Sequence, residues 1–234
     1  MQVLDIGSGA GDVALLLADI VGPSGRVVGI DTNAEILETA RARVDAAGLS
    51  NVTFKAGDVM NAGLPVGFDA VVGRWILMYL PNPVAAIRFL ATRVHPGGII
   101  AFHESDFTYP PTMFPPSELS EQVLRWSLPP AHLAQGGPDV HMGSQLFRVF
   151  VDAGLPAPNL RTEAPMGGGP HWTGYEYVAE TLRSLMPAMQ RMGVVDPAEV
   201  EIDTLAERLR DDAVAGARVQ MLPLVVGAWS RRPA

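Results

Sequence analysis

The segment DIGSGAGDVALLL, from Asp5 to Leu17, decides how the rest of the sequence is interpreted. Its glycine-rich loop joins a short apolar run at 2–6 to an apolar segment with helical spacing at 12–22. Because glycine has no Cβ atom, such a loop can turn tightly and can let a ligand approach the backbone. By itself, the pattern also fits an ordinary turn between a strand and a helix.

Strand and helix patterns alternate through the first half of the chain. Apolar runs typical of strands lie at 26–31, 51–58, 68–74 and 99–105, and helical patterns lie at 34–48 and 83–98. Strands joined by helices of this length imply right-handed crossovers, and therefore a mostly parallel sheet covered on both faces. The ligand crevice of such a sheet lies at the carboxyl ends of its strands.

The second half of the chain has a different character. A stretch rich in proline and aromatic residues at 104–143 is followed by a helical pattern at 144–155. Two late strands are expected at 157–165 and 216–232, and a mainly helical insert at 175–214 separates them. We expect a single domain over 1–234, with insertions at 104–143 and 170–215 that cover the crevice. A separate second domain is the alternative.

Composition limits the class of protein. A 48% hydrophobic content with 18% charged residues is typical of a folded globular protein. The chain has no cysteine, which excludes disulfides and thiolate chemistry and fits a reducing compartment, so we expect a cytoplasmic protein. The net charge of −8 comes without a basic block, which disfavours nucleic acid and anionic membranes as partners. No apolar stretch approaches the roughly 20 residues of a membrane span.

An acidic residue after the second strand indicates which class of ligand the glycine loop could bind. Asp31 ends the second strand, 20 positions after Gly11, where an aspartate can accept hydrogen bonds from both hydroxyls of a ribose. The ligand is therefore expected to be a nucleoside derivative. The dinucleotide fingerprint requires glycine or alanine where Asp12 stands, and a carboxylate there would repel a pyrophosphate and favour a cationic ligand. A simple helix cap is the commoner role for such an aspartate.

Several segments together carry a family resemblance. In order, VLDIGSGAGDVA, VVGIDTN, FKAGDV, FDAVVGRWILMYL and HPGGIIAFHE resemble the class I S-adenosylmethionine-dependent methyltransferases, closely over residues 1–106. The resemblance implies an α/β fold with a doubly wound, mostly parallel seven-stranded sheet, the Rossmann-like methyltransferase fold. It also implies S-adenosyl-L-methionine as the cofactor. Because the inserts are apolar and basic patches are absent, the expected methyl acceptor is a small, partly apolar molecule.

The resemblance assigns cofactor-binding roles to residues of this chain. It implies that Asp5 and the backbone of Gly7, Ser8 and Gly9 surround the methionine portion, Asp31 binds the ribose, Thr32 packs near the adenine, Asp58 and Val59 bind its edge, and Arg74 lines the methionine end. Two alternatives from the residues alone stay open. Asp58 then caps a turn, and Arg74 pairs with a surface carboxylate.

Methyl transfer from a sulfonium requires mainly that the acceptor be held in line and that water be excluded. Strand alternation separates His103 and Glu104 onto opposite faces, so we favour Glu104 as the catalytic residue that contacts the acceptor and keep His103 as the alternative base. A supporting hydrogen-bonding role is the competing interpretation for each. Tyr79, Asp106 and His171 are the predicted substrate-binding residues, and packing within the insert or a surface loop is the alternative for Tyr79 and His171. Histidine spacing predicts no metal site.

Other functions stay open. A nicotinamide-dependent oxidoreductase is disfavoured by Asp12 and by the absence of a Tyr-x-x-x-Lys relay, since the only lysine is Lys55. A non-catalytic protein that binds the cofactor or a partner is the other alternative. In the resembled family helices precede the first strand, whereas only 1–4 precede Asp5, so we expect weaker cofactor binding than in a version extended upstream. Late apolar strands fit a core or an interface, which leaves a homo-oligomer open.

Overall fold

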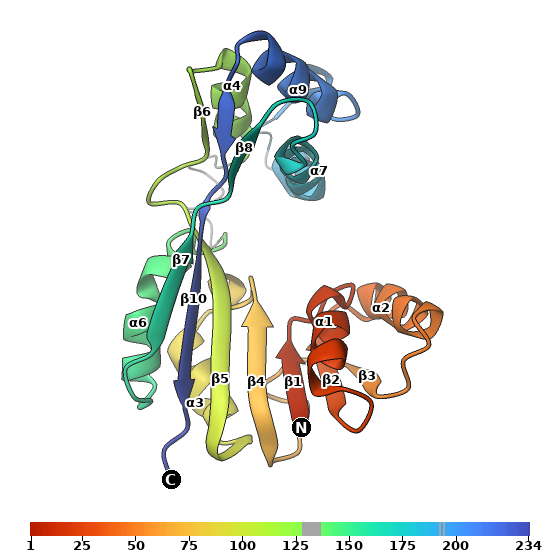
Figure 1. The fold of residues 1–234 in the computed structure, drawn as a ribbon, viewed down its shortest axis with the longest axis vertical. Coiled ribbons are helices and arrows are strands. Elements are labelled where there is room, and N and C mark those ends of the chain that lie inside the picture. Colours follow the sequence, from red (N-terminus) through yellow and green to blue (C-terminus); the bar gives the residue numbers. More distant parts are fainter. Residues whose placement is uncertain (128–136, 192, 194) are drawn as a thin grey trace. The chain divides into compact units, whose positions relative to one another are not determined.

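The computed structural model describes residues 1–127, 137–191, 193 and 195–234, and the chain forms two compact units (Figure 1). Unit 1 comprises Met1–Ser105, Val140–Thr162 and Val226–Ala234, and unit 2 comprises Asp106–Asp139 and Glu163–Val225. Each unit has a hydrophobic core of its own. The expected single domain with covering insertions stays a prediction.

Unit 1 is built on the predicted sheet. Seven strands lie in the order β3-β2-β1-β4-β5-β10-β7, and the pairs β1–β2, β2–β3, β1–β4 and β4–β5 are parallel. Their bounds are Gln2–Ile6 for β1, Arg26–Asp31 for β2, Val52–Ala56 for β3, Phe68–Arg74 for β4, Val94–Asp106 for β5, Asn159–Glu163 for β7 and Leu224–Arg231 for β10. In Figure 1 the arrow of β10 runs opposite to that of β4. The predicted mostly parallel seven-stranded α/β sheet is confirmed.

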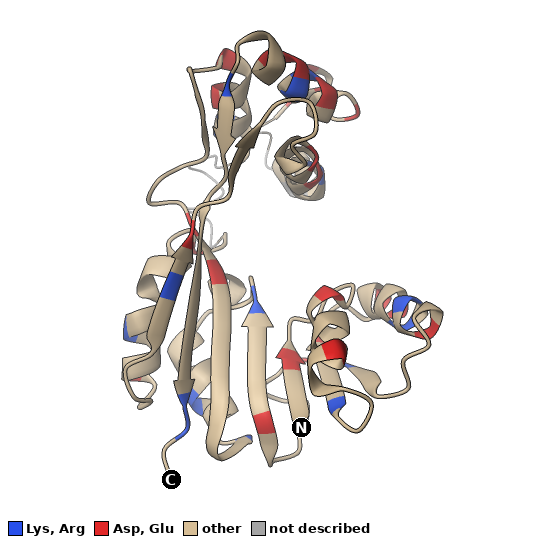
Figure 2. Cartoon of the chain, in the orientation of Figure 1, with Lys and Arg blue, Asp and Glu red and all other residues tan. Residues whose placement is uncertain are grey.

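Helices cover both faces of this sheet. They are α1 at Asp12–Val21, α2 at Ala34–Ala46, α3 at Pro83–Ala91 and α6 at Met142–Asp152, with the short 3₁₀ helix η1 at Leu77–Tyr79. Successive strand residues point to opposite faces, so Val3 packs in the cluster that includes α1 and α2, while Leu4 packs in the cluster that includes α3 and α6. Charged residues lie mainly on helices and near strand ends, and the middle of the sheet is mostly uncharged (Figure 2).

Two predicted boundaries in the sheet are wrong. The helix expected at 83–98 ends at Ala91, and β5 begins at Val94, because the ladder with β4 continues through the proline–glycine segment. The register shifts between the Phe68–Val94 and Ala70–Ile99 pairs, and such a bulge accommodates residues that cannot pair regularly. The single strand expected at 216–232 is two strands, β9 at Val219–Met221 and β10, since a proline at 223 interrupts the ladder.

Unit 2 combines a small sheet with helices. The antiparallel sheet β6-β9-β8 consists of Thr112–Phe114, Val219–Met221 and Met166–Gly168, and the described helices are α4 at Glu118–Ser127, α7 at Gly174–Arg191, α8 at Pro197–Val200 and α9 at Leu205–Ala215. Tyr175, Leu182 and Leu209 are fully buried between them. The predicted helical character of 175–214 is confirmed for the described residues. Of the helices in the described part of the chain, none has both the length and the apolar character needed to cross a membrane.

Candidate cofactor site

The loop between β1 and α1 requires glycine for two reasons. Gly7, Gly9 and Gly11 have φ angles of 67°, 49° and 87°, in the left-handed region that favours glycine. A Cβ atom at Gly7 would lie 2.8 Å from Cδ1 of Ile76. The N–H groups of residues 7 and 8 both donate to the carbonyl of Ile30, at 2.8 and 3.0 Å, which ties the loop to the end of β2.

Asp31 lies at the end of β2 and holds the same loop. Its Oδ2 accepts from the backbone N–H of Gly9 at 2.9 Å, and its Oδ1 accepts from that of Asn33 at 2.9 Å, next to the start of α2. A carboxylate has roughly four acceptor sites. Two sites therefore remain for the ribose hydroxyls that the sequence predicts at this residue.

A hollow of about 340 Å³, including the solvent at its mouth, lies within unit 1 beside the carboxyl ends of β1 and β2. Its volume is in the range of small-molecule sites. Five predicted cofactor residues line it, together with Ile6, Ile30, Gly57, Ile76 and Leu80; the five are Gly7, Asp31, Thr32, Asp58 and Val59. The sequence interpretation missed the aliphatic residues, although Ile76 and Leu80 directly follow the fourth strand, where a crevice is expected.

Asp58 has a structural role as well as a place in the hollow. Its Oδ1 accepts from the N–H of Met60 at 2.9 Å, and its Oδ2 accepts from Nδ2 of Asn61 at 3.1 Å. Asp58 therefore caps the turn, as the alternative interpretation of this residue expects. Because the residue also lines the hollow, its predicted role toward adenine stays compatible with the geometry.

Asp5 is a buried carboxylate beside the glycine loop. Neither of its oxygens has a hydrogen-bond partner of ordinary geometry among the described residues. The buried hydroxyl of Ser8 likewise has none among them. Burial raises the pKa of Asp5 to about 7, an effect that the guanidinium of Arg74 and the backbone N–H of Ala14 oppose and the carboxylate of Asp31 reinforces. An unpartnered buried polar group is energetically costly, so these atoms point to a ligand that pairs with them.

Arg74 ends β4 and makes the contact that the alternative interpretation expected. Its Nη2 lies 3.4 Å from Oδ2 of Asp12, and its guanidinium carbon lies 4.9 Å from the ring centre of Trp75. Its charge also acts on Asp5. Arg74 is therefore near the buried carboxylate, and its predicted place at the methionine end of the cofactor stays a prediction.

Asp12 is the first residue of α1, and the N-cap position belongs to Gly11. Its Oδ1 lies 2.7 Å from Nη1 of Arg43, and the same nitrogen donates to the carbonyl of Ala10 at 2.8 Å. With Arg74 on its other oxygen, Asp12 faces two guanidinium groups. Its repulsion of a pyrophosphate is therefore weaker than the sequence argument assumed.

Glu104 lies on β5 and is completely buried. Its Oε1 accepts from the backbone N–H groups of Ile76 at 3.0 Å and Leu77 at 2.8 Å, while its Oε2 has no partner of ordinary geometry in the part of the chain that the structure describes. Burial raises the pKa of Glu104 to about 7, and these N–H groups oppose the rise. The side chain thus anchors the segment that brings Ile76 and Leu80 to the hollow, a role that an acidic residue in an apolar strand could have suggested.

The remaining predicted residues lie in different units. In unit 1, His103 is half-buried on β5 and Tyr79 is 60% exposed on η1. In unit 2, Asp106 is buried and accepts from the N–H of Thr108 at 2.9 Å, and His171 is exposed. Their roles toward an acceptor stay predictions. Within the residues that the structure describes, no three acidic or histidine side chains gather in a way that would hold a metal ion.

Comparison with known proteins supplies the family. Residues 1–137 match the family model described as a methyltransferase domain, which is more than half of the chain. The chain belongs to this methyltransferase family. The predicted family, the class I S-adenosylmethionine-dependent methyltransferases, is therefore confirmed, and S-adenosylmethionine is the cofactor of that family.

Two relatives show how far the sequence similarity of this methyltransferase-family chain extends. Aklanonic acid methyltransferase DauC of Streptomyces sp. (strain C5) is 37% identical over 134 residues, which cover 55% of this chain and 60% of that protein. Demethylmenaquinone methyltransferase of Geobacillus stearothermophilus is 31% identical over 129 residues, which cover 55% of this chain and 54% of that protein. The match thus spans less than two thirds of the length of either relative.

The fold of this methyltransferase-family chain is shared more widely. The crystal structure of the YcgJ protein from Bacillus subtilis aligns with a TM-score of 0.60, at 19% identity, over 100% of this chain and 92% of that one. Identity at this level supports a common fold alone. The predicted Rossmann-like methyltransferase fold is confirmed by the alignment and by the strand order.

Proposed function

We propose that this chain binds S-adenosylmethionine in the hollow of unit 1 and catalyses methyl transfer to a small, partly apolar molecule. The observation that carries the proposal is one crevice in which the glycine loop and Asp31 meet, beside the buried, unpartnered carboxylate of Asp5. The names of the two relatives support a small acceptor, because they specify aklanonic acid and demethylmenaquinone.

The residues of the hollow fit the parts of the cofactor. Asp31 has acceptor sites left for two ribose hydroxyls, and Asp58 and Val59 line the hollow where the adenine is expected. The carboxylate of Asp5 suits the cationic methionine portion, since an opposite charge would compensate its burial. Gly7 cannot carry a side chain without meeting Ile76, which also lines the hollow.

S-adenosylmethionine, when bound, supplies a methyl group that its positively charged sulfur has already activated. The chain must then orient the acceptor and exclude water. Glu104 contributes to orientation by fixing the backbone of Ile76 and Leu77. If the acceptor loses a proton, His103 and the unpartnered Oε2 of Glu104 are the proposed groups to take it, and Tyr79, Asp106 and His171 are the proposed contacts to the acceptor.

Isothermal titration calorimetry tests the cofactor part of this proposal. S-adenosylhomocysteine is expected to bind the wild type with a micromolar Kd, and Asp31→Asn is expected to weaken it by about tenfold or more, because hydrogen bonds to a charged group are lost. Asp45→Asn changes the same charge at an exposed position of α2 and is expected to leave the Kd unchanged.

Two results would contradict the proposal. Preferential binding of NAD would assign the hollow to a dinucleotide, an outcome that matters because Asp12 is balanced by Arg43 and Arg74. Equal Kd values for S-adenosylhomocysteine in the Asp31→Asn variant and the wild type would remove Asp31 from the site. Circular dichroism of each variant separates a loss of binding from a loss of fold.

A further inference from the structure

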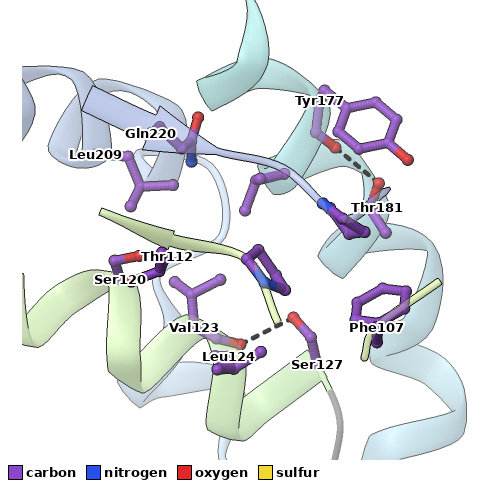
Figure 3. Close-up of a pocket in the computed structure, with 13 residues that line it drawn as sticks. Phe107, Thr112, Ser120, Val123, Leu124, Ser127, Tyr177, Thr181, Leu209 and Gln220 are labelled. Carbon is purple, nitrogen blue, oxygen red and sulfur yellow. Dashed lines mark hydrogen bonds between the residues drawn. The ribbon is translucent and has the colours of Figure 1, made fainter. Parts of the chain in front are cut away.

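Unit 2 contains a second pocket, separate from the cofactor hollow (Figure 3). It has a volume of about 580 Å³, including the solvent at its mouth, and lies among α4, α7, α9 and the strands β6 and β9. None of its 13 lining residues carries a charge, and most are apolar. A charged ligand would lose its hydration there without compensation, so the pocket suits an uncharged molecule.

Two of the hydroxyl groups at the pocket, those of Ser127 and Thr181, are oriented by their own helices. Oγ of Ser127 donates to the carbonyl of Val123 at 2.8 Å, and Oγ1 of Thr181 donates to the carbonyl of Tyr177 at 2.7 Å (Figure 3). Each hydroxyl has a single hydrogen, which these bonds use. Toward a ligand, both groups therefore offer lone pairs and no donor.

Gln220 provides a donor that these two hydroxyls do not. It lies on β9, the middle strand of the small sheet, and is only 3% exposed. Its Oε1 accepts from Nε1 of Trp172 at 3.0 Å, which fixes the orientation of the amide, and no hydrogen bond from its Nε2 is found among the described residues. In Figure 3 the nitrogen points to the side where Leu209 and Thr112 lie, and the oxygen points away from them. A largely buried N–H group gains from an oxygen partner.

We propose that this pocket binds the uncharged, apolar body of the methyl acceptor, and that Nε2 of Gln220 donates a hydrogen bond to a carbonyl oxygen of that molecule. The assignment of the ligand as the acceptor rests on the proposed methyltransferase function. The pocket itself, its neutrality and its fixed donor belong to unit 2 alone. The class of ligand is thus a neutral, largely apolar molecule that carries at least one carbonyl.

Three probes of similar size test the class of ligand by calorimetry or ligand-observed NMR on the full chain. Menadione, a methylated naphthoquinone, has two carbonyl groups, 2-methylnaphthalene has none, and 2-naphthoate is an anion. Since the chain has no cysteine, thiol addition to the quinone does not interfere. Menadione is expected to bind most tightly, and 2-naphthoate at least about tenfold more weakly, because none of the described lining residues is a cation.

Three substitutions test whether the probes bind in this pocket. Gln220→Leu is expected to weaken menadione about five- to tenfold, the effect of one hydrogen bond, and to change 2-methylnaphthalene by less than about twofold. Gln190→Leu makes the same change at an exposed position of α7 and is expected to have no effect. Leu124→Trp fills the pocket and is expected to abolish binding of both probes. If Gln220→Leu does not fold, a shift of the Gln220 side-chain amide signals on addition of menadione to the wild type provides the same test.

The two proposals fail separately. Binding of 2-naphthoate as tight as that of menadione, or menadione binding unchanged in Leu124→Trp, would overturn the pocket proposal, and intact binding of S-adenosylhomocysteine in the same samples would leave the cofactor site standing. Menadione binding that depends on Gln220 in a chain that does not bind S-adenosylhomocysteine would support the pocket as a ligand site and overturn its assignment to a methyl acceptor.

Discussion

Replacing Glu104 with glutamine should remove a pH dependence from the stability of unit 1. Burial raises the pKa of this carboxyl from 4.5 to about 7 in the folded chain. Between these values the folded state binds more protons than the unfolded state, so the free energy of unfolding falls as pH rises. The shift corresponds to a loss of about 3 kcal/mol once pH exceeds the folded pKa. Glutamine stays uncharged, and its Oε1 can still accept from Ile76 and Leu77.

Urea denaturation followed by circular dichroism between about pH 5 and pH 9 measures this effect. Asp5 has a similarly raised pKa and titrates in both proteins, so the informative quantity is the difference between Glu104→Gln and the wild type. The free energy of unfolding of the variant, relative to that of the wild type, should increase by about 3 kcal/mol as pH rises through 7. Glu35→Gln, at an exposed position of α2, should show no such change. Parallel stability curves for Glu104→Gln and the wild type would refute the reasoning.

Three further perturbations test the site and the two units. Gly7→Ala should destabilise the chain by about 1–3 kcal/mol and weaken the binding of S-adenosylhomocysteine, because its φ of 67° disfavours a side chain and the new Cβ would meet Ile76. Thermal melts and calorimetry measure the two effects, and Gly22→Ala, with a φ of 69° but open space around it, controls for backbone strain. Leu182→Ala in the core of unit 2 should lower the free energy of unfolding by about 2–5 kcal/mol, as measured by denaturation. Its Kd for S-adenosylhomocysteine should stay unchanged because the cofactor hollow lies in unit 1, and a parallel loss of affinity would contradict this. The affinity for cationic S-adenosylmethionine should rise between about pH 6 and pH 8 as Asp5 ionises, and calorimetry of Asp5→Asn should show a flat profile.

The parallel part of the fold could be predicted because each strand is apolar and each crossover is a helix of ordinary length. The errors lie where pairing overrides local signals. Pro96, Gly97 and Gly98 are typical of a loop, yet a bulge carries them within β5. The three-residue strands β6 and β8 are too short to show a period of two, and they form because β9 lies between them.

The site could be predicted where the backbone imposes a residue type. The glycine loop and Asp31 have a fixed spacing, and the family resemblance points to Thr32, Asp58 and Val59. Of these residues Gly7, Asp31, Thr32, Asp58 and Val59 line the hollow, and their contacts to a cofactor stay predictions. Aliphatic residues of the hollow could not, because a residue such as Ile76 has the same pattern in a core. The pocket around Gln220 could not be found either, since its walls come from segments far apart in the chain.

The two buried carboxylates show what sequence alone does not distinguish. Asp5 and Glu104 both lie on apolar strands, and burial raises the pKa of each to about 7. Glu104 has one oxygen held by the N–H groups of Ile76 and Leu77, so its main contribution is to the structure of that segment. Among the described residues neither oxygen of Asp5 has a hydrogen-bond partner of ordinary geometry, although the nearby N–H of Ala14 lowers its pKa. Since a poorly paired buried carboxylate destabilises the chain that carries it, a ligand cation would add to the partial compensation that Arg74 provides at Asp5.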